Sequence, residues 1–324
     1  MSKRLIMLLG CTLLAIALVA CSNSATSEKE ESSAGEIQTA ATRVVKDTFG
    51  DVTIPASPKN IIVTNSSYAE YLIEIGVTPQ IVLFVPLLEP EYRTPYFEKH
   101  GVKIIFSEQY QFNYEQMLSL SPDLIVAQGE GLEAKTYEDL SKIAPTIAVS
   151  AGPGMEEAIP KLAEIFNKTE EANQVLSAFG EKAAKAKEKI HQAIGDKTVL
   201  VLRVEPTRYR YLGSQAGNVS TLFYQTLGLK IPEIFKDTKE WFTPFSLEIL
   251  PDIKPDYIFV EKRMMENYDS SESLKELEEN SLWKNMDAVK NNRVFPLKTN
   301  DYIQGQGPIG SSMLIDYLVE KLVP

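Results

Sequence analysis

Short apolar runs alternate with amphipathic stretches along the first half of the chain. The apolar runs are rich in β-branched residues and lie at 60–65, 80–85, 103–107 and 123–127. Between them, as at 68–76, polar and apolar positions follow the spacing of a helix. Strands that alternate with helices are typical of βαβ units, so we expect a mostly parallel sheet in this half.

The longest helical pattern covers residues 169–195. Its apolar positions recur at spacings of three and four: Ala172, Val175, Leu176, Phe179, Ala183, Ala186 and Ile190. Thr169 is suited to cap the helix and Gly195 to end it. About 26 residues at 1.5 Å each span roughly 39 Å, which is longer than a small lobe is wide. We interpret 169–195 as a connecting helix, because the alternating pattern restarts beyond it; a surface helix within one domain is the alternative.

The second half repeats the plan of the first. A strand is expected at 198–205, and RYRYLG (208–213) is its return strand after a turn at Pro206-Thr207. Residues 113–128 and 246–261 share the pattern x-x-E-x-L-x-x-x-x-P-D-x-I. This weak internal duplication suggests two similar lobes. We therefore predict an α/β protein of two Rossmann-like lobes, at 43–168 and 196–324, joined by a single long helix.

The N-terminus predicts export and a lipid anchor. Residues 1–20 carry Lys3 and Arg4 before a short apolar run, as a secretory signal peptide does. Leu18 to Cys21 resembles the lipobox of bacterial lipoproteins, so Cys21 is the predicted lipidation site; an ordinary signal peptide with an incidental cysteine is the alternative. Residues 21–42 read as a flexible tether. We expect an extracytoplasmic protein attached to the cell membrane.

Composition narrows the function. The formal net charge is −11 and no basic stripe is present, so we expect no nucleic-acid partner. The only cysteines are Cys11, in the signal, and Cys21, and the only histidines are His100 and His191. A resident metal site is therefore not expected. The motifs G-x-S-x-G, H-E-x-x-H and the P-loop are absent, so we predict a binding protein; an extracytoplasmic enzyme is the alternative.

Several segments resemble one family. SLSPDLIVA, LSKIAPTI, NVSTLFYQTLGL, FSLEILPDIKPDYIFV and GPIGSSMLIDYL are similar to segments of the substrate-binding lipoproteins of iron–siderophore and cobalamin ABC importers. The resemblance covers about 43–322. It implies a class III periplasmic binding protein with a shallow cleft, a monomer that binds a ferric siderophore and delivers it to an ABC permease. The protein would need no cofactor, because the siderophore holds the iron. A haem or cobalamin receptor of the same fold, or a signalling receptor, is the alternative.

The Arg- and Tyr-rich hairpin supplies the main ligand candidates. Period-2 alternation places Arg208 and Arg210 on one face of the return strand and Tyr209 and Tyr211 on the other. In the resembled family this region borders the cleft, and guanidinium groups match anionic oxygens. The alternative is a solvated hairpin whose arginines pair with nearby Glu residues. The candidates in this lobe are Arg203, Arg208, Arg210, Tyr211 and Trp241.

Other candidates come from loops that follow strands, where ligands bind in such sheets. In the first half these are Tyr68, Arg93 and Tyr110, and before the last helix Tyr302. Aromatic residues at these places are more often part of a core.

The resemblance also implies one surface glutamate per lobe for docking on the permease. Glu248, in S-x-E-x-L, fits that pattern in the second lobe. In the first lobe Ala134 stands at the usual position, so Glu133 is the candidate and Glu130 the alternative. Either is also a common residue at a helix start.

Overall fold

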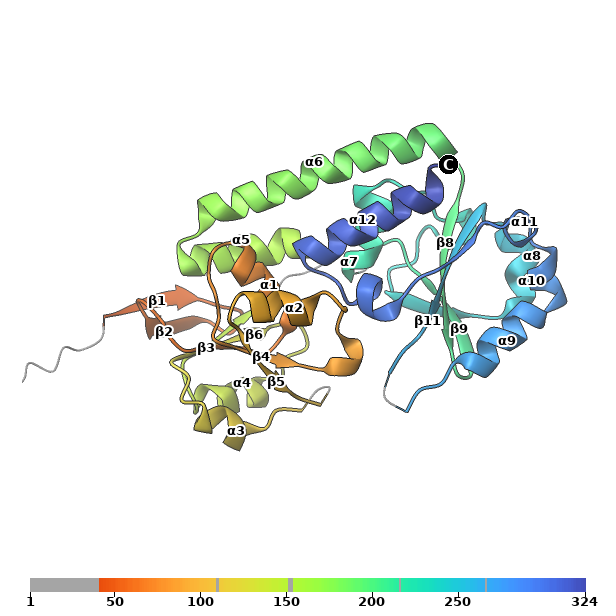
Figure 1. The fold of residues 1–324 in the computed structure, drawn as a ribbon. Helices are drawn as coiled ribbons and strands as arrows, with labels where there is room; N and C mark the ends of the chain where they lie inside the picture. Colours follow the sequence, from red (N-terminus) through yellow and green to blue (C-terminus); the bar gives the residue numbers. More distant parts are fainter. Residues whose placement is uncertain (1–40, 109–110, 151–153, 216, 266) are drawn as a thin grey trace, which may run out of the picture. The chain divides into compact units, whose positions relative to one another are not determined.

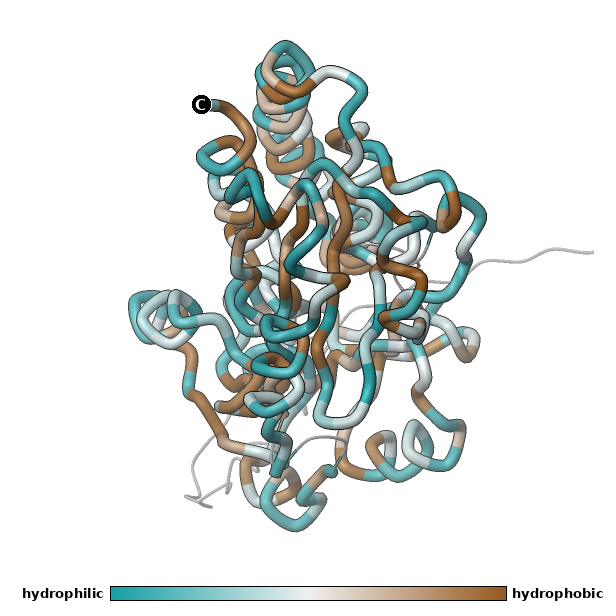
Figure 2. The backbone as a smooth tube through the Cα atoms, turned by 90° about the vertical axis from the view of Figure 1, so that its right-hand side faces the viewer, coloured by the Kyte–Doolittle hydropathy of each residue, from teal (hydrophilic) through white to brown (hydrophobic). Residues whose placement is uncertain are grey.

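The computed structural model of this 324-residue chain describes residues 41–108, 111–150, 154–215, 217–265 and 267–324. Its architecture is α/β with two five-stranded sheets and one long helix, α6 (Thr169–Ile194), which follows the first sheet and precedes the second in the chain (Figure 1). The predicted fold class is confirmed. Figure 2 shows hydrophobic stretches along the strands, as expected for sheets covered by helices on both faces.

The first sheet is fully parallel, in the order β5-β4-β3-β6-β7. Its strands are β3 (Ile61–Val63), β4 (Ile81–Phe84), β5 (Lys103–Phe106), β6 (Leu124–Gln128) and β7 (Thr146–Val149). The helices around it are α1 (Ser66–Glu74), α2 (Arg93–Lys99), α3 (Tyr114–Ser119), α4 (Ala134–Ser141) and α5 (Met155–Phe166). An antiparallel hairpin precedes it, β1 (Thr42–Lys46) with β2 (Asp51–Pro55). The sequence pattern placed strands at β3, β4, β5 and β6 but did not indicate the hairpin.

The second sheet is mixed, in the order β10-β9-β8-β11-β12. Its strands are β8 (Val199–Glu205), β9 (Arg208–Leu212), β10 (Phe242–Phe245), β11 (Tyr257–Lys262) and β12 (Val294–Pro296). β9 runs antiparallel to both of its neighbours, β8 and β10, whereas β8, β11 and β12 are parallel to one another. The sequence pattern did not indicate β10. Pro244 obscured the strand, but proline is tolerated here because β10 is the edge of the sheet.

Short helices and turns complete the second half. They are α7 (Gly217–Ser220), a π-helical turn at Thr221–Thr226, α8 (Leu250–Ile253), α9 (Ser271–Glu279), α10 (Ser281–Asn285), α11 (Asp287–Lys290) and α12 (Pro308–Leu322). 3₁₀ turns lie at Pro86–Leu88, Glu233–Phe235 and Leu247–Ile249, and a second π-helical turn at Thr299–Ile303. The two segments that share the P-D motif lead into β6 and β11. These strands hold equivalent places in the two sheets, which agrees with the duplication inferred from sequence.

The long helix α6 packs through the predicted apolar stripe. Ala172, Phe179, Ala183, Ala186 and Ile190 are buried, and the helix also pairs with α12 through Lys182 and Asp316 (2.6 Å). The helix ends where expected, since Gly195 takes a left-handed backbone (φ +58°) that suits glycine. Thr169 is its first helical residue rather than its cap, which is Lys168.

A buried carboxylate ties α1 to the start of α12. Glu70 is fully buried and accepts a hydrogen bond from the backbone N–H of Ile309 (2.9 Å). The hydroxyl of Tyr71 donates to the carbonyl of Gln306 (3.0 Å). An anion at a helix N-terminus is favourable because the first N–H groups have no partner within the helix. The loop before α12 is therefore held against a helix of the first half.

Candidate ligand-binding cleft

A cavity of about 730 Å³ lies at the carboxyl ends of β3 and β6. In the first sheet β4 and β5 lie on one side of β3, and β6 and β7 on the other. Loops that leave two such strands diverge, and the crevice between them is where ligands bind in open α/β sheets. Residues 64–67 after β3 and residues between 128 and 133 after β6 line the cavity. Loops that follow strands, where the sequence analysis looked for ligand contacts, therefore line this cavity.

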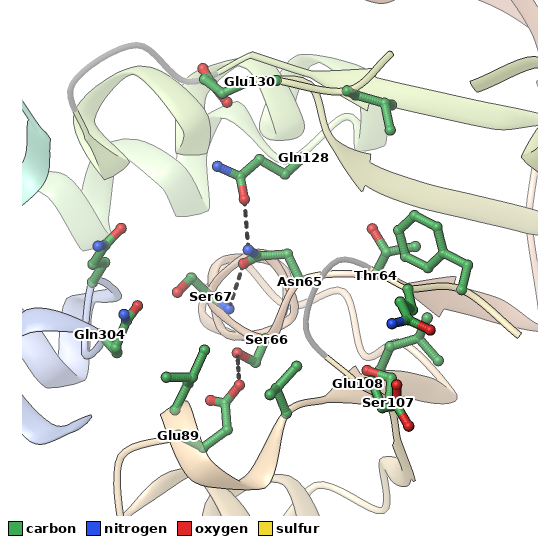
Figure 3. A pocket seen from close by; sticks show the side chains of 18 of the residues that line it. Thr64, Asn65, Ser66, Ser67, Glu89, Ser107, Glu108, Gln128, Glu130 and Gln304 are labelled. Carbon is green, nitrogen blue, oxygen red and sulfur yellow. Dashed lines mark hydrogen bonds between the residues drawn. The ribbon is translucent and has the colours of Figure 1, made fainter. Parts of the chain in front are cut away.

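Hydrogen bonds fix the polar wall of this cavity (Figure 3). Asn65 caps α1 by accepting from the backbone N–H of Ser67 (2.9 Å), and its amide donates to Gln128 (2.7 Å). The hydroxyl of Ser66 donates to Glu89 (2.6 Å). Gln304 reaches the same cavity from the loop before α12. The wall is preorganised, since each of these polar groups on the first sheet's loops is already held by a neighbour.

Arg93 lines the cavity but is a structural residue. Its side chain is almost fully buried and makes four hydrogen bonds, to Glu70 (3.2 Å), Glu89 (3.0 Å), Ser66 (3.0 Å) and Ser67 (2.8 Å). A guanidinium has five N–H donors, so little of its bonding capacity is left for a ligand. Arg93 was predicted to contact the ligand, but its hydrogen bonds instead hold α1 against the loop after β4.

A second cavity, of about 590 Å³, lies beside β8, β9 and β10. Arg203, Arg208 and Arg210 line it, so the three arginines picked out in the sequence are gathered there. Trp241 and Arg263 line both cavities, which makes the two spaces adjoining parts of one cleft. Trp241 sits on Gly217, whose left-handed backbone (φ +80°) and missing side chain leave room for the indole.

The predicted alternation of the hairpin is confirmed. Arg208 and Arg210 both pair with Glu205, the latter at 3.3 Å. Burial acts to raise the pKa of Glu205, but the hydrogen bond from Arg208 and the two positive charges outweigh it and hold that pKa below its ordinary value. Tyr209 and Tyr211 face the other side of the sheet.

Tyr211 is a correction, because its position in the core of the second lobe is incompatible with ligand contact. Its ring stacks on Phe235, with centroids 3.6 Å apart, and its side chain is 6% exposed. Its hydroxyl forms a hydrogen bond with the hydroxyl of Thr238 (2.8 Å). The ring of Tyr302 also stacks on a neighbour, Tyr317 of α12, with centroids 4.5 Å apart, whereas Gln304, two residues further along the chain, lines the cleft.

Arg203 is enclosed by its neighbours. Its guanidinium binds both oxygens of Glu261 (2.6 and 3.2 Å) and lies 3.4 Å from the ring centroid of Phe242. The residue is 3% exposed, and burial lowers its pKa although Glu261 opposes the shift. Arg203 is therefore paired with a glutamate, but it is buried, whereas Arg208, which is exposed and pairs with the nearby Glu205, fits the alternative of a solvated hairpin.

Arg263 is a charged cleft residue that the sequence analysis missed. It directly follows β11, at the carboxyl end of a central strand, and its side chain is 9% exposed. The same rule that selected loops after first-half strands would have found it in VEKRMM. That rule was applied to the second half only at Trp241 and Tyr302.

The remaining predicted residues fall in different places. Tyr68 is buried and its hydroxyl donates to the carbonyl of Val149 (2.7 Å); burial raises its pKa, and the negative charge of Glu130 adds to the effect. Cys21 and Tyr110 lie outside the described residues. Of the docking candidates, Glu133 is exposed at the start of α4, and Glu130 borders the cleft beside it. Glu248 is exposed, with its backbone N–H bonded to Ser246 (3.3 Å).

Charge is divided unequally between the walls of the cleft. Carboxylates border it on the first sheet's side, at Glu89, Glu108, Glu130 and Glu133, with the buried Arg93 among them. Guanidinium groups border it on the second sheet's side, at Arg203, Arg208, Arg210 and Arg263, with Glu205 and Glu240 among them. An anionic group in this cleft is attracted to the second side and repelled by the first.

Two features of the described residues bear on function. No cluster of three or more His, Cys, Asp or Glu side chains in the described ranges could hold a metal ion. Across those same ranges, every helix is too short or too polar to span a membrane.

Comparison with known proteins identifies the family. The profile described as "Periplasmic binding protein" matches residues 61–300. The iron(3+)-hydroxamate-binding protein FhuD of Bacillus subtilis is 30% identical, over 96% of this chain and 95% of that protein. Among solved structures, Staphylococcus aureus SirA complexed with staphyloferrin B is 26% identical, with a TM-score of 0.70 over 87% of this chain and 98% of that one. A FhuD-fold protein of Bacillus subtilis, described as part of a ferrichrome ABC transporter, has a TM-score of 0.71 at 27% identity, over 86% of this chain and 99% of that one.

The chain therefore belongs to the periplasmic binding protein family, in its FhuD-like group of iron–siderophore substrate-binding proteins. This confirms the resemblance found in the sequence. The family consists of binding proteins, so the chain is not an enzyme.

Proposed function

We propose that this protein is a lipid-anchored receptor that binds a ferric siderophore outside the cytoplasmic membrane and delivers it to an ABC permease. The observation that carries the proposal is the arginine-lined half of the cleft at the carboxyl ends of β8 and β11. Siderophore complexes present many oxygen atoms, and guanidinium groups bind such oxygens in fixed geometry. Named relatives that bind hydroxamate or staphyloferrin B complexes support the class of ligand.

The first test is a ligand titration of the mature domain. The panel contains ferrichrome, ferric staphyloferrin B, ferric citrate, haemin and cobalamin, and binding is followed by quenching of Trp241 and Trp283. Trp241 lines the cleft and Trp283 is buried in α10, so the signal reports mainly on the cleft. Saturable binding of a ferric siderophore supports the proposal. Saturation by haemin or cobalamin alone would identify a different substrate. No binding across the panel would reject the proposed receptor function.

Arg210→Ala is expected to weaken binding of the ferric siderophore roughly ten-fold, the effect of losing one hydrogen bond to a charged group. Arg210 is partly exposed to the cleft and is held by Glu205 and the carbonyl of Phe242. The same titration measures the change. Lys290→Ala, at the end of α11 and outside both cavities, is the control and should bind as the wild type does. An unchanged affinity in Arg210→Ala would remove this residue from the site.

Glu248→Lys is expected to reduce iron uptake by cells without changing siderophore affinity. If Glu248 docks on arginines of the permease, charge reversal replaces attraction by repulsion and costs roughly ten-fold or more in docking. Uptake of the radioactive iron complex is compared with binding by the purified domain. Glu181→Lys, on the exposed side of α6, is the matched control. Equal uptake by the Glu248→Lys and Glu181→Lys variants would exclude Glu248 from docking. The Glu133→Lys variant tests the docking candidate of the first lobe in the same way.

A further inference from the structure

Two arginines, Arg203 and Arg263, lie beside Glu261, and they differ in how many of their hydrogen-bond donors are satisfied. Glu261 is fully buried on β11, and both of its oxygens accept hydrogen bonds from Arg203. The hydroxyl of Thr299 also donates to it (2.8 Å). Arg203 is covered on one face by Phe242. Arg203 and Glu261 thus form a closed pair whose bonding capacity is largely used inside the protein.

Arg263 lies next to this pair but is not satisfied by it. Its Nη1 is 3.8 Å from Glu261, which is within range of charge attraction but too far for a hydrogen bond. Among the described residues this buried nitrogen has no hydrogen-bond partner. Leaving a buried charged donor without an acceptor is unfavourable, so such a group in a native protein calls for an explanation.

Trp241, where the two cavities adjoin, also has a donor that is unpaired within the described ranges. Its indole Nε1 is a second buried donor with no acceptor among the described residues. Both Trp241 and Arg263 line the two cavities that make up the cleft. These two donors, Trp241 Nε1 and Arg263 Nη1, call for an acceptor that the described residues do not supply. An oxygen-rich group of the ligand would provide it.

We propose that Arg263 binds a carboxylate of the siderophore and sets the preference of this cleft for carboxylate-bearing ferric complexes. The inference rests on the proposed function and names its substrate class. The carboxylate supplies the acceptor that Nη1 lacks and can bind a guanidinium in a bidentate manner. Each buried carboxylate of this region, Glu205 and Glu261, is shared by two guanidiniums, so positive charge is left over for an anion.

The test is calorimetric titration of Arg263→Gln with ferric staphyloferrin B, ferric citrate and ferrichrome, the last being a neutral hydroxamate complex. We expect a loss of about 10- to 100-fold for the carboxylate complex, the effect of one hydrogen bond between charged groups, and less than about three-fold for ferrichrome. Arg293→Gln is the matched control. Arg293 precedes β12, packs over Tyr257 and lines neither cavity, so its variant should bind all ligands as the wild type does.

Each result has a distinct meaning. Equal loss for all three complexes, or no loss for any, overturns the role of Arg263 while leaving the receptor function intact. A wild-type protein that binds ferrichrome but neither carboxylate complex overturns the substrate class. A wild-type protein that binds none of them rejects the proposed function itself. Arg263→Lys keeps the charge without the planar fork, and we expect an intermediate affinity for the carboxylate complex; thermal melting of each variant shows that it is folded.

Discussion

Replacing Arg93 by methionine is expected to lower the free energy of unfolding by about 3–5 kcal/mol, the range found when one partner of a buried ion pair is removed. Arg93 is 1% exposed and bonds to Glu70, which is fully buried, and to Glu89. Methionine fills much of the same space, so the loss arises from two carboxylates left without their counter-charge. Urea unfolding followed by circular dichroism measures the change.

Two further variants separate this effect from a general loss of packing. The double variant Arg93→Met with Glu70→Gln should recover part of the lost stability, because it also removes the charge that was left unpaired. Lys142→Met breaks an exposed ion pair with Asp139 and should leave the unfolding midpoint unchanged. If Arg93→Met unfolds at the wild-type urea concentration, the network around Glu70 contributes little to the fold.

The strands were predictable because their signal is local. A strand such as residues 123–127 must be apolar throughout when both faces of a parallel sheet are covered. This run can therefore be recognised in the sequence without knowing which residues it contacts. The hairpin β1–β2 and the edge strand β10 are less apolar and partly exposed. Their strand character comes from pairing with a neighbour, which the local pattern does not contain.

The sequence indicated the location of the candidate cleft better than it indicated which of its side chains are available to a ligand. Loops at the carboxyl ends of strands do form the cleft, and the arginines of the hairpin do gather beside it. Whether an arginine is available to a ligand depends on partners far away in the sequence. Arg203 is hydrogen-bonded to Glu261, and Arg93 to Glu70. These partners lie too far apart in the sequence for a short motif to indicate the pairing. Among the described residues one nitrogen of Arg263 has no such partner, and only the structure reveals this.

The glycine-rich segment GQGPIG, at 305–310, is explained by close packing. A Cβ at residue 307 would overlap the carboxylate of Glu70, and one at residue 310 would overlap the backbone of Gly305. The backbone of Gly307 (φ −87°, ψ 177°) is open to any residue, so its requirement is for space alone. Glycine here lets the start of α12 approach the buried carboxylate that bonds to Ile309.

Gly307→Ala is therefore expected to destabilise the protein by about 2–4 kcal/mol, since it both overpacks a buried site and displaces a buried charge from its partners. Siderophore affinity should fall with stability, because Gln304 and Gln306 reach the cleft from the same loop. Thermal unfolding and the ligand titration are measured on the same preparation. An alanine that is accommodated with wild-type stability would mean that Glu70 and α12 can separate freely.

Gly180→Ala provides the matched control for this substitution. Gly180 lies inside α6, and a Cβ there would meet no atom within 4 Å. Alanine is favoured over glycine in a helix interior by roughly 0.5–1 kcal/mol, so this variant should be more stable than the wild type. The same chemical change is thus expected to have opposite signs at two glycines. That contrast isolates the contact between Glu70 and the start of α12 as the cause of the loss at residue 307.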